Sequence, residues 1–490
     1  MHEIRIESPR VDGDRIELAW RVEPERALHQ RTSFHLRVEN AAQLPERVLW
    51  LLAMLALHPH WVLLRPCRIH LPIRLGAGEK EFWLRLLDAT VATLEGNRGG
   101  DDFARSIEIV EDGAPLAEIA PLPDRGRCAV AFSGGKDSLL TTGLLSELVP
   151  SVLLVTTTSP MPPLYDHITE RRRHVLRSIA TRRANLRLLE VESDYRASWK
   201  NDFPPSVGYQ VATNELVDTF LYLASLIAAA WTDGATHLFL ASEAEVQENV
   251  EIDGRTVQHP HAMYSVATQD AVAALLARFG MRYGSLTSPL RSEQVQQLLW
   301  QRYPDLADLQ YSCWRVGPNE ATCSSCSQCL RIAFASLAIG ESPSRMGIDL
   351  RKLIGTMRGW EPRTAPKSEL PNERVAFELH AQTVRSIVGT PLWRVAKEMP
   401  LTARGLLGIV RFVRFRRRLA RVPAAAAPGY RPAYLRHVDP LVRERLAAIY
   451  AASFGADRSD RIEVMRQRGE ALASWIAEPL QESSAVEGVA

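Results

Sequence analysis

The sequence predicts an α/β protein with a doubly wound parallel sheet, an N-terminal α+β domain and an α-helical C-terminal region. Three observations predict it. Between about residues 126 and 350, short apolar β-rich runs alternate with helical patterns, which is typical of a parallel sheet with helices on both faces. A Gly-Gly turn joins the first of these runs to a helix, and the strand pattern stops near residue 355. We therefore expect three regions, over 1–125, 126–350 and 351–490.

Length and composition limit the classes of function that the chain can have. With 490 residues the chain is too long for one ordinary domain, and at 46% hydrophobic it can bury a sizeable core. The formal net charge of +2 gives no global argument for nucleic acid, although nucleic acid stays open as a partner. The N-terminus lacks the apolar core of a signal peptide, and no apolar run is long enough to span a membrane. These features predict a cytoplasmic protein.

Residues 1–125 mix strand and helix patterns. Strand-like alternation covers 15–22, 32–38 and 68–73, and helical apolar spacing covers 44–57 and 79–94. Turn-rich stretches at 112–115 and 121–126 predict the linker to the next region.

The central region predicts repeated strand–helix–strand units. The expected strands are 128–132, 151–158, 185–191 and 236–241, and the expected helices are 139–145, 165–184, 214–232, 267–279 and 292–301. The carboxyl ends of parallel strands meet at one edge of the sheet, where ligands bind. Residues after 132, 158 and 241 should therefore share a site.

The C-terminal region, 351–490, predicts helices over 401–421 and 441–476 and a disordered tail over 481–490. The first helix carries seven arginines between apolar residues. It fits a nucleic-acid patch, a membrane-surface helix, a surface for an acidic protein partner or a plain solvated basic face.

The segment Ser133-Gly134-Gly135-Lys136-Asp137-Ser138 follows the first expected strand and opens a helix. Glycines let the backbone adopt positive φ and approach a ligand closely. Exposed N–H groups and the dipole at a helix N-terminus favour an anion, and the serine hydroxyls and the lysine add donors. The loop predicts a phosphate cradle, and it is not the Walker pattern, which has four residues between its glycines.

This Ser-Gly-Gly-x-Asp-Ser segment resembles the PP-loop of the N-type ATP pyrophosphatases. The resemblance implies an adenine nucleotide alpha hydrolase-like, Rossmann-like fold and cleavage of ATP between its α- and β-phosphates, with Mg²⁺. It also implies site roles: the catalytic residues are Lys136, Asp137 and Ser138, and the ATP-binding residues are Ser133, Gly134, Gly135, Asp137, Ser138, Thr156, Thr157 and Thr158.

Four of the six cysteines cluster as Cys313, Cys323, Cys326 and Cys329. This spacing predicts a closed tetrahedral Zn²⁺ site, and an iron–sulfur cluster is the alternative because it also uses four cysteines. Cys67 and Cys128 lie in apolar runs and are interpreted as core residues.

The loop and the cysteines together resemble the QueC (7-cyano-7-deazaguanine synthase)-like branch over about residues 127–340. The matching segments are Ser312-Cys313-Trp314, the triple-cysteine run followed by Leu330-Arg331, and Ser288-Pro289-Leu290. The resemblance implies a ligase that forms a carbon–nitrogen bond. Its acceptor is a carboxylate like 7-carboxy-7-deazaguanine, and its donor is ammonia or an amine. QueC-like proteins with extra domains occur in antiviral systems, so a defence or modification pathway is also implied.

The segment after the strand at 236–241 departs from that branch and holds the substrate candidates Ser242, Glu243, Glu245, Glu248, Asn249 and His261. His259 and Tyr264, and more weakly Asp194 and Tyr195, join them because they follow expected strand ends. The acidic residues could bind magnesium or an amine, and a solvated acidic loop fits them equally.

The leading hypothesis is an ATP-dependent ligase that releases AMP and pyrophosphate. One alternative is a tRNA-thiolating PP-loop enzyme with an iron–sulfur cluster, and another is a scaffold that binds ATP without turning it over. A protein partner and a homodimer stay open as well.

Overall fold

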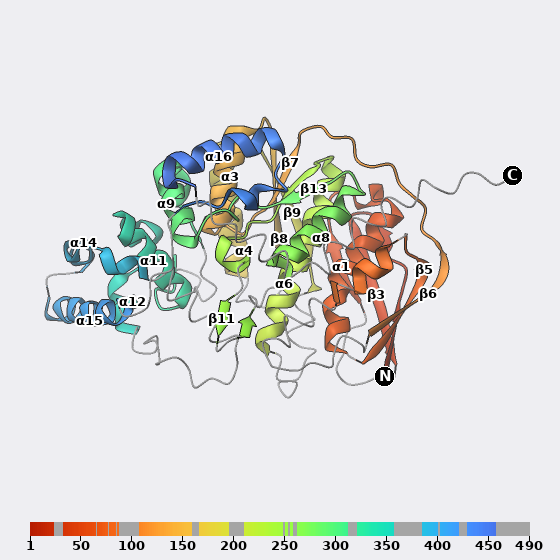
Figure 1. Cartoon of the computed structure of the whole chain (residues 1–490), viewed down its shortest axis with the longest axis horizontal. Coiled ribbons are helices and arrows are strands. Elements are labelled where there is room, and N and C mark those ends of the chain that lie inside the picture. Colours follow the sequence, from red (N-terminus) through yellow and green to blue (C-terminus); the bar gives the residue numbers. More distant parts are fainter. Residues whose placement is uncertain are drawn as a thin grey trace.

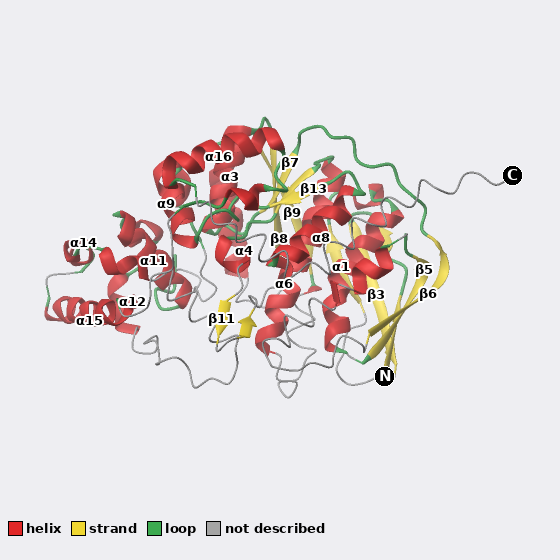
Figure 2. Cartoon of the chain, viewed as in Figure 1, coloured by secondary structure: helices red, strands yellow, loops and turns green. Residues whose placement is uncertain are grey.

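The structure is a computed structural model in which one central sheet is flanked by helices (Figure 1). It describes residues 1–23, 33–64, 66–76, 78–84, 86–87, 107–158, 166–195, 210–247, 250–252, 255–257, 262–311, 321–356, 385–399, 402–420 and 429–456. Over these residues the sheet has eleven strands, most neighbouring strands run parallel, and helices cover it (Figure 2). The predicted α/β class and its parallel sheet are confirmed at this level.

Half of the sheet is doubly wound. Its five strands lie side by side in the order β13-β10-β7-β8-β9 and are all parallel. Their bounds are β7 (Cys128–Ala131), β8 (Val152–Thr158), β9 (Leu186–Ser193), β10 (His237–Phe239) and β13 (Arg282–Gly284). The chain leaves β7 in one direction through β8 and β9 and returns on its other side through β10 and β13. This order is compatible with a Rossmann-like fold, and it opens a crevice at the carboxyl ends of β7 and β10.

The N-terminal strands continue the same sheet instead of forming a separate one. β4 pairs antiparallel with β9, so that Leu36 lies opposite Ser193 and Arg37 opposite Glu192. Beyond β4 the order is β3-β1-β5-β6, with β2 paired to β3. The strands are β1 (His2–Ile6), β2 (Arg10–Asp12), β3 (Arg15–Glu23), β4 (Ser33–Arg37), β5 (Cys67–Arg74) and β6 (Ile107–Pro115). The N-terminal α+β region therefore extends the parallel half of the sheet by edge pairing.

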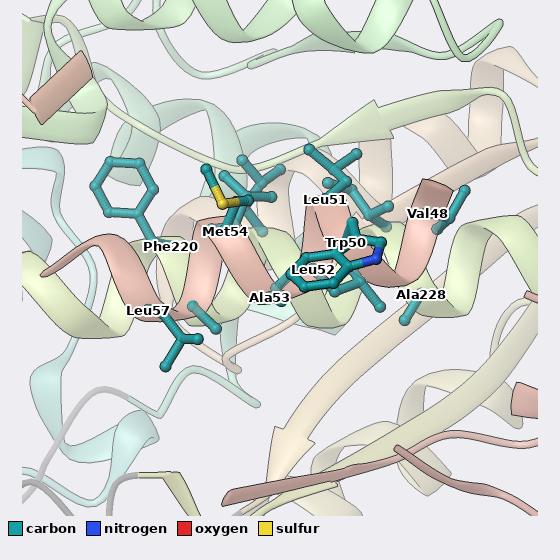
Figure 3. Close-up of a cluster of buried hydrophobic side chains, with 14 of the residues drawn as sticks. Val48, Trp50, Leu51, Leu52, Ala53, Met54, Leu57, Phe220 and Ala228 are labelled. Atoms are coloured by element: carbon teal, nitrogen blue, oxygen red, sulfur yellow. The ribbon is translucent and has the colours of Figure 1, made fainter. Parts of the chain in front are cut away.

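Two long helices cover this junction. α1 (Glu46–Leu63) packs along α6 (Gln210–Asp233), and Figure 3 shows Trp50 and Leu57 of α1 with Phe220 and Ala228 of α6 in one apolar cluster. All four side chains are almost fully buried. The same cluster includes residues of both halves of the sheet, so the two halves share one core.

A second core lies over α3 (Lys136–Leu148), α9 (Ser292–Arg302), α11 (Ser327–Ile339) and α16 (Pro440–Phe454). The other α-helices and strands of the described residues are α4 (Asp166–Ala180), α7 (Ala244–Gln247), α8 (Val266–Ala277), α10 (Pro304–Ala307), α12 (Leu350–Thr356), α14 (Leu392–Lys397), α15 (Ala403–Leu419), β11 (Val250–Ile252) and β12 (Arg255–Val257). The C-terminal helix α16 returns to α3, where the Arg445 guanidinium donates to the Leu148 carbonyl at 3.0 Å.

The predicted arginine-rich helix is α15, at the end of the molecule away from β6 (Figure 1). Phe412 and Phe415 are buried against Phe334 of α11, with ring centroids 5.7 and 5.8 Å apart. Its outer side exposes Leu406 and Leu407, and Arg404 is exposed as well. The predicted C-terminal helix is described to Phe454, and the expected tail over 481–490 lies outside the described residues. Among the described helices none is both long and apolar enough to cross a membrane.

Candidate active site

The Ser133–Ser138 loop lies at the crevice that the sheet order creates. It follows β7 directly, and α3 begins at Lys136 with Gly135 as its N-cap. β7 is short and apolar and is buried between β8 and β10. The predicted strand, glycine turn and helix N-terminus are therefore confirmed in that order.

The loop is held by its own hydroxyl groups. The Gly134 N–H donates to Ser138 Oγ at 3.1 Å, and Ser138 Oγ donates to the Gly135 carbonyl at 3.0 Å. Gly134 has φ +81°, a backbone conformation that favours glycine. Its carbonyl accepts a hydrogen bond from the Tyr311 N–H at 2.7 Å. Gly135 caps α3 without a side-chain acceptor, so the first turn of the helix presents N–H groups at the crevice.

Charged side chains from three elements meet at this loop. Lys136 Nζ lies 2.9 and 3.0 Å from the two carboxylate oxygens of Asp137, and it also forms an ion pair with Glu243. The second oxygen of Glu243 lies 3.9 Å from Arg331 of α11. The Lys136 and Glu243 side chains are only 11% and 10% exposed, so solvent screens their attraction weakly. Arg331 in turn donates to Ser292 Oγ on α9 at 3.5 Å.

Two cavities meet at the loop. The first, cavity A, holds about 260 Å³, and the second, cavity B, about 220 Å³. They share a boundary made of Ser133, Asp137, Arg172, Ala241 and Tyr264. Cavity A extends from the loop to α9 and α11, whereas cavity B extends along β7 and β8. A ligand that spans both would pass directly over the loop.

The three threonines at the end of β8 differ in their surroundings. Thr157 lines cavity B, and its carbonyl accepts from Arg172 of α4 at 3.0 Å. Thr158 instead donates to Glu190 at 2.9 Å, and Thr156 is buried and lines neither cavity. The hydrogen bond from Arg173, with a further one from Thr158, holds the pKa of Glu190 below its usual range. The alternation of a β-strand explains why only the middle threonine reaches the cavity.

The substrate candidates also differ in whether they line a cavity. Ser242 and Glu243 line cavity A, together with Tyr264, which also lines cavity B. Ser242 is held by Ser285, whose Oγ accepts from the Ser242 N–H at 3.0 Å. Glu245 lies on α7, just after these residues. Glu248, Asn249, His259 and His261 lie outside the described residues.

Two weaker candidates serve the fold instead. The Asp194 carboxylate accepts from the His35 N–H at 2.6 Å, and the Tyr195 hydroxyl donates to the Ala56 carbonyl at 2.5 Å. Both side chains tie the end of β9 to the N-terminal region and line neither cavity. Burial raises the pKa of the Cys128 thiol to about 12, which agrees with its interpretation as a core residue.

Cys323, Cys326 and Cys329 form a cluster whose sulfur atoms all lie within 4.8 Å of one another. The sulfur of Cys329 is 3.8 Å from that of Cys323 and 3.5 Å from that of Cys326. Tetrahedral zinc with Zn–S bonds of about 2.3 Å separates its sulfurs by about 3.8 Å, so the three cysteines fit zinc. Cys313, the fourth predicted ligand, lies outside the described residues. Cys326 also caps α11, where its sulfur accepts from the Cys329 N–H.

The sequence analysis missed several residues that line cavity A, among them the polar residues Arg172, Ser292 and Gln296. Arg172 is 6% exposed and lines both cavities. The sequence feature that could have pointed to Arg172 is the run of three arginines on the helix after the second expected strand. Ser292 and Gln296 lie one turn apart on α9, where a polar residue in an amphipathic pattern gives no sign that it faces a cavity.

Comparisons with known proteins give no relative: no family model matches the chain, and neither a curated protein nor a solved structure does. The class that the fold and the site define is an α/β protein with a glycine loop and a helix N-terminus at the switch point of its sheet, an arrangement that suits an anion, and with a three-cysteine cluster that could hold a metal such as zinc.

Proposed function

We propose that this protein is an ATP-dependent ligase that releases AMP and pyrophosphate, adenylating a carboxylate so that ammonia or an amine can attack it. One observation carries the proposal: the Ser-Gly-Gly-Lys-Asp-Ser loop lies at the boundary of two cavities, at the switch point of the sheet. A reaction between two bound molecules needs two sites that meet at the reacting phosphate.

In this proposal ATP lies over the loop. Its phosphates bind the N–H groups at the start of α3, with Lys136 and Arg172 as cations beside them. The nucleoside extends into cavity B, next to Thr157, and the acceptor occupies cavity A. Ser133, Asp137 and Ser138 offer oxygen donors of the kind that Mg²⁺ prefers, and Asp137 is the residue we assign to the metal that accompanies ATP.

The chemistry has two steps. An acceptor carboxylate oxygen attacks the α-phosphorus, the bond from the α-phosphorus to the bridging oxygen breaks, and pyrophosphate leaves. The nitrogen of ammonia or an amine then attacks the acyl carbon, the bond from this carbon to the AMP oxygen breaks, and the nitrogen loses a proton. Fixed cations and N–H groups at the loop stabilise the negative charge that develops on the phosphate oxygens. Glu243, whose carboxylate lines cavity A, takes up this proton in the proposal.

Zinc has a structural role in the proposal. Cys323, Cys326 and Cys329, with Cys313 as the fourth ligand, would hold it as a closed site without an open position for chemistry. The cluster lies at the start of α11, and this helix supplies Gln328 and Arg331 to the wall of cavity A. The metal would fix the position of that wall.

The resemblance to the QueC-like branch supports a carboxylated acceptor such as 7-carboxy-7-deazaguanine. It also supports a role in a defence or modification pathway of the cytoplasm, with a protein partner as one source of the amine. The residues after β10 differ from that branch, so the amine and the final product are assigned less narrowly than the ATP chemistry.

The test is to incubate the purified chain with ATP labelled at the α-phosphate, Mg²⁺, ammonium and 7-carboxy-7-deazaguanine, and to separate the nucleotide products. We expect labelled AMP, and we expect mass spectrometry to detect a product in which the nitrogen of ammonium has been joined to the carboxyl carbon of the acceptor. The Lys136→Met variant should lose AMP formation, and Lys397→Met, on exposed α14, should keep it. Labelled ADP from the wild type would rule out cleavage between the α- and β-phosphates. ATP binding without any turnover across a panel of carboxylates would favour the scaffold alternative.

A further inference from the structure

Exposed apolar side chains are concentrated on the helices α14 and α15. Most of the large apolar side chains that the described residues expose lie there: Leu392, Trp393, Leu406, Leu407 and Val410. The others are Met1 at the N-terminus and Leu188 on β9. Single apolar residues scattered over a surface are ordinary, whereas a concentration of them marks a surface that contacts another molecule.

The helix α15 has apolar residues on two opposite sides. Phe412, Phe415 and Leu419 are buried in the second core. Leu407 and Val410 lie on roughly the opposite side of the helix, because they precede Phe412 by five and two positions. These two side chains are 50% and 46% exposed. A helix that only packs on its own protein needs one apolar side, so the outer apolar side indicates a further contact.

The same outer side of α15 is positively charged. Arg414 and Arg417 follow Leu407 and Val410 at intervals of three and four residues, so these side chains share a face of the helix. Both arginines are exposed, and so is Arg404 in the first turn. The helix contains no acidic residue, and in the described part of the chain none of these three arginines forms an ion pair. A partner of this surface should therefore be both anionic and apolar.

The neighbouring helix α14 adds an exposed tryptophan with cations beside it. Trp393 is 56% exposed, and its ring centroid lies 4.7 Å from Lys397 Nζ and 5.5 Å from Arg394 Cζ. The Arg416 guanidinium donates to the Thr390 carbonyl at 2.9 Å, which holds the start of α14 against the last turns of α15. At the surface of a membrane the indole of a tryptophan lies among the lipid headgroups, and cations next to it can meet the phosphates.

We propose that α14 and α15 bind the surface of an anionic lipid bilayer, a role that does not depend on the ATP chemistry. The first half of α15 inserts Leu406, Leu407 and Val410 among the headgroups, and Arg414 and Arg417 meet the lipid phosphates. In Figure 1 the two helices lie at one end of the molecule, and no other described element lies beyond them. A lipid surface deforms around such a convex end, whereas a protein partner would need a matching groove. Nucleic acid would pair with the arginines but leave the aliphatic side chains exposed.

The test is sedimentation of the full chain with vesicles of phosphatidylcholine and phosphatidylglycerol in equal parts, and with vesicles of phosphatidylcholine alone. We expect binding to the anionic vesicles only, and weaker binding as the salt concentration rises. Leu407→Ser should weaken this binding by about 5-fold, because about half of the side chain is left to bury. Arg414→Gln should also weaken it by about 5-fold at low salt. Leu188→Ser and Arg125→Gln, at exposed positions elsewhere, are the matched controls and should bind like the wild type.

Circular dichroism checks that the variants are folded, which we expect because Leu407 and Arg414 are exposed. A wild type that does not bind the anionic vesicles, or that binds both kinds of vesicle equally, refutes the proposal. Binding that Leu407→Ser leaves unchanged also refutes it, because the apolar side of α15 then takes no part. Two further measurements can overturn it in favour of another partner. A dimer in analytical ultracentrifugation that Leu407→Ser dissociates would show that a second copy covers this side. An RNA duplex that binds the wild type, in the absence of vesicle binding, and is released by Arg414→Gln would identify a nucleic-acid surface.

Discussion

Lys136 and Glu243 form an ion pair that joins the loop after β7 to the segment after β10. The two residues are more than a hundred positions apart in the sequence, and they meet because β7 and β10 are neighbouring parallel strands. The pair bridges the crevice at the switch point, and both side chains are nearly buried. In the proposed function, the phosphates of ATP compete with Glu243 for Lys136.

This competition predicts opposite effects for the two partners. Glu243→Gln should tighten ATP binding by about 3-fold to 10-fold at low salt, because a carboxylate next to the phosphates repels them. Lys136→Met should weaken ATP binding by about 10-fold or more, because a charge-assisted contact is lost. Titration with ATP at two ionic strengths checks both, and the gain in Glu243→Gln should shrink at high salt. Weaker ATP binding in Glu243→Gln would mean that Glu243 binds a metal or another ligand group instead.

The loop itself predicts a loss of chemistry with the fold intact. Asp137→Ala should abolish AMP formation, and Ser138→Ala should lower it about 100-fold, because Ser138 Oγ holds both Gly134 and Gly135. The control is Ser146→Ala, also on α3, whose hydroxyl donates to the Gly143 carbonyl away from the loop. AMP and pyrophosphate release is measured alongside circular dichroism. AMP release at the wild-type rate from both loop variants contradicts the assignment.

The cysteine cluster predicts one zinc ion per chain. Cys326→Ser should lose most of the metal and unfold at a temperature roughly 5–10 °C lower, because a closed thiolate site contributes folding energy. Serine is a good N-cap residue, so the loss of the Cys326 cap on α11 does not account for such a change. Ser325→Ala, at the neighbouring exposed position, should retain both metal and stability. Stoichiometric iron and sulfide in protein purified without oxygen would identify an iron–sulfur cluster and favour the thiolation alternative.

Local sequence patterns predicted β7, the loop and α3. The way the N-terminal strands join the sheet depends on long-range strand pairing, which these patterns do not show. The apolar run before Ser133 and the glycines after it are a strand–turn–helix signal within a dozen residues, which is why this part of the site could be read from sequence. The pairing of β4 with β9 joins Leu36 to Ser193, and no local pattern records such an edge contact. β13 was missed because its three residues, Arg282–Gly284, lack an apolar run like the one that contains the equally short β10.

The wall of cavity A that α9 and α11 form could not be predicted from the sequence either. Gln296 lies in an amphipathic helix where a glutamine reads as a surface residue. Its burial follows from the packing of α9 against α11, which depends on contacts such as the one between Gln296 and Ser336. A residue that is buried between two helices can be recognised only when both helices are placed.

The contact between α3 and α9 predicts a pH-dependent stability. The Glu147 carboxylate accepts from Arg302 at 2.9 Å and from the Tyr303 hydroxyl at 2.7 Å. The Arg302 hydrogen bond lowers the pKa of Glu147 in the folded protein. A lowered folded pKa adds stability above the unfolded value of about 4.3, and this stability is lost as the pH falls through the folded pKa.

Glu147→Gln should therefore lower the free energy of unfolding by about 0.5–1 kcal/mol at pH 6, an estimate kept small because the Glu147 side chain is 37% exposed. The difference from the wild type should begin to shrink as the pH falls below the unfolded value of about 4.3, and it should vanish only below the lowered folded pKa of Glu147, where both proteins carry a neutral side chain. Urea unfolding at pH 6 and at pH 3.5 measures it, with the exposed Glu39→Gln as control. A difference that is constant with pH would mean that packing, not charge, accounts for the effect.

The same contact predicts that a single methyl group on α3 destabilises the protein. A Cβ atom at Gly143 would lie 2.7–2.9 Å from three ring atoms of Tyr303, and this ring is held in place by its bond to Glu147. Alanine normally favours a helix over glycine by about 1 kcal/mol, whereas overpacking a well-packed contact costs about 1–3 kcal/mol. Gly143→Ala should therefore lower the free energy of unfolding by up to about 2 kcal/mol. Gly355→Ala on α12 is the matched control, because no atom lies within 4 Å of its Cβ position, and it should be neutral or stabilising. Urea unfolding of both variants decides the matter: equal effects would show that α3 and Tyr303 separate at little cost.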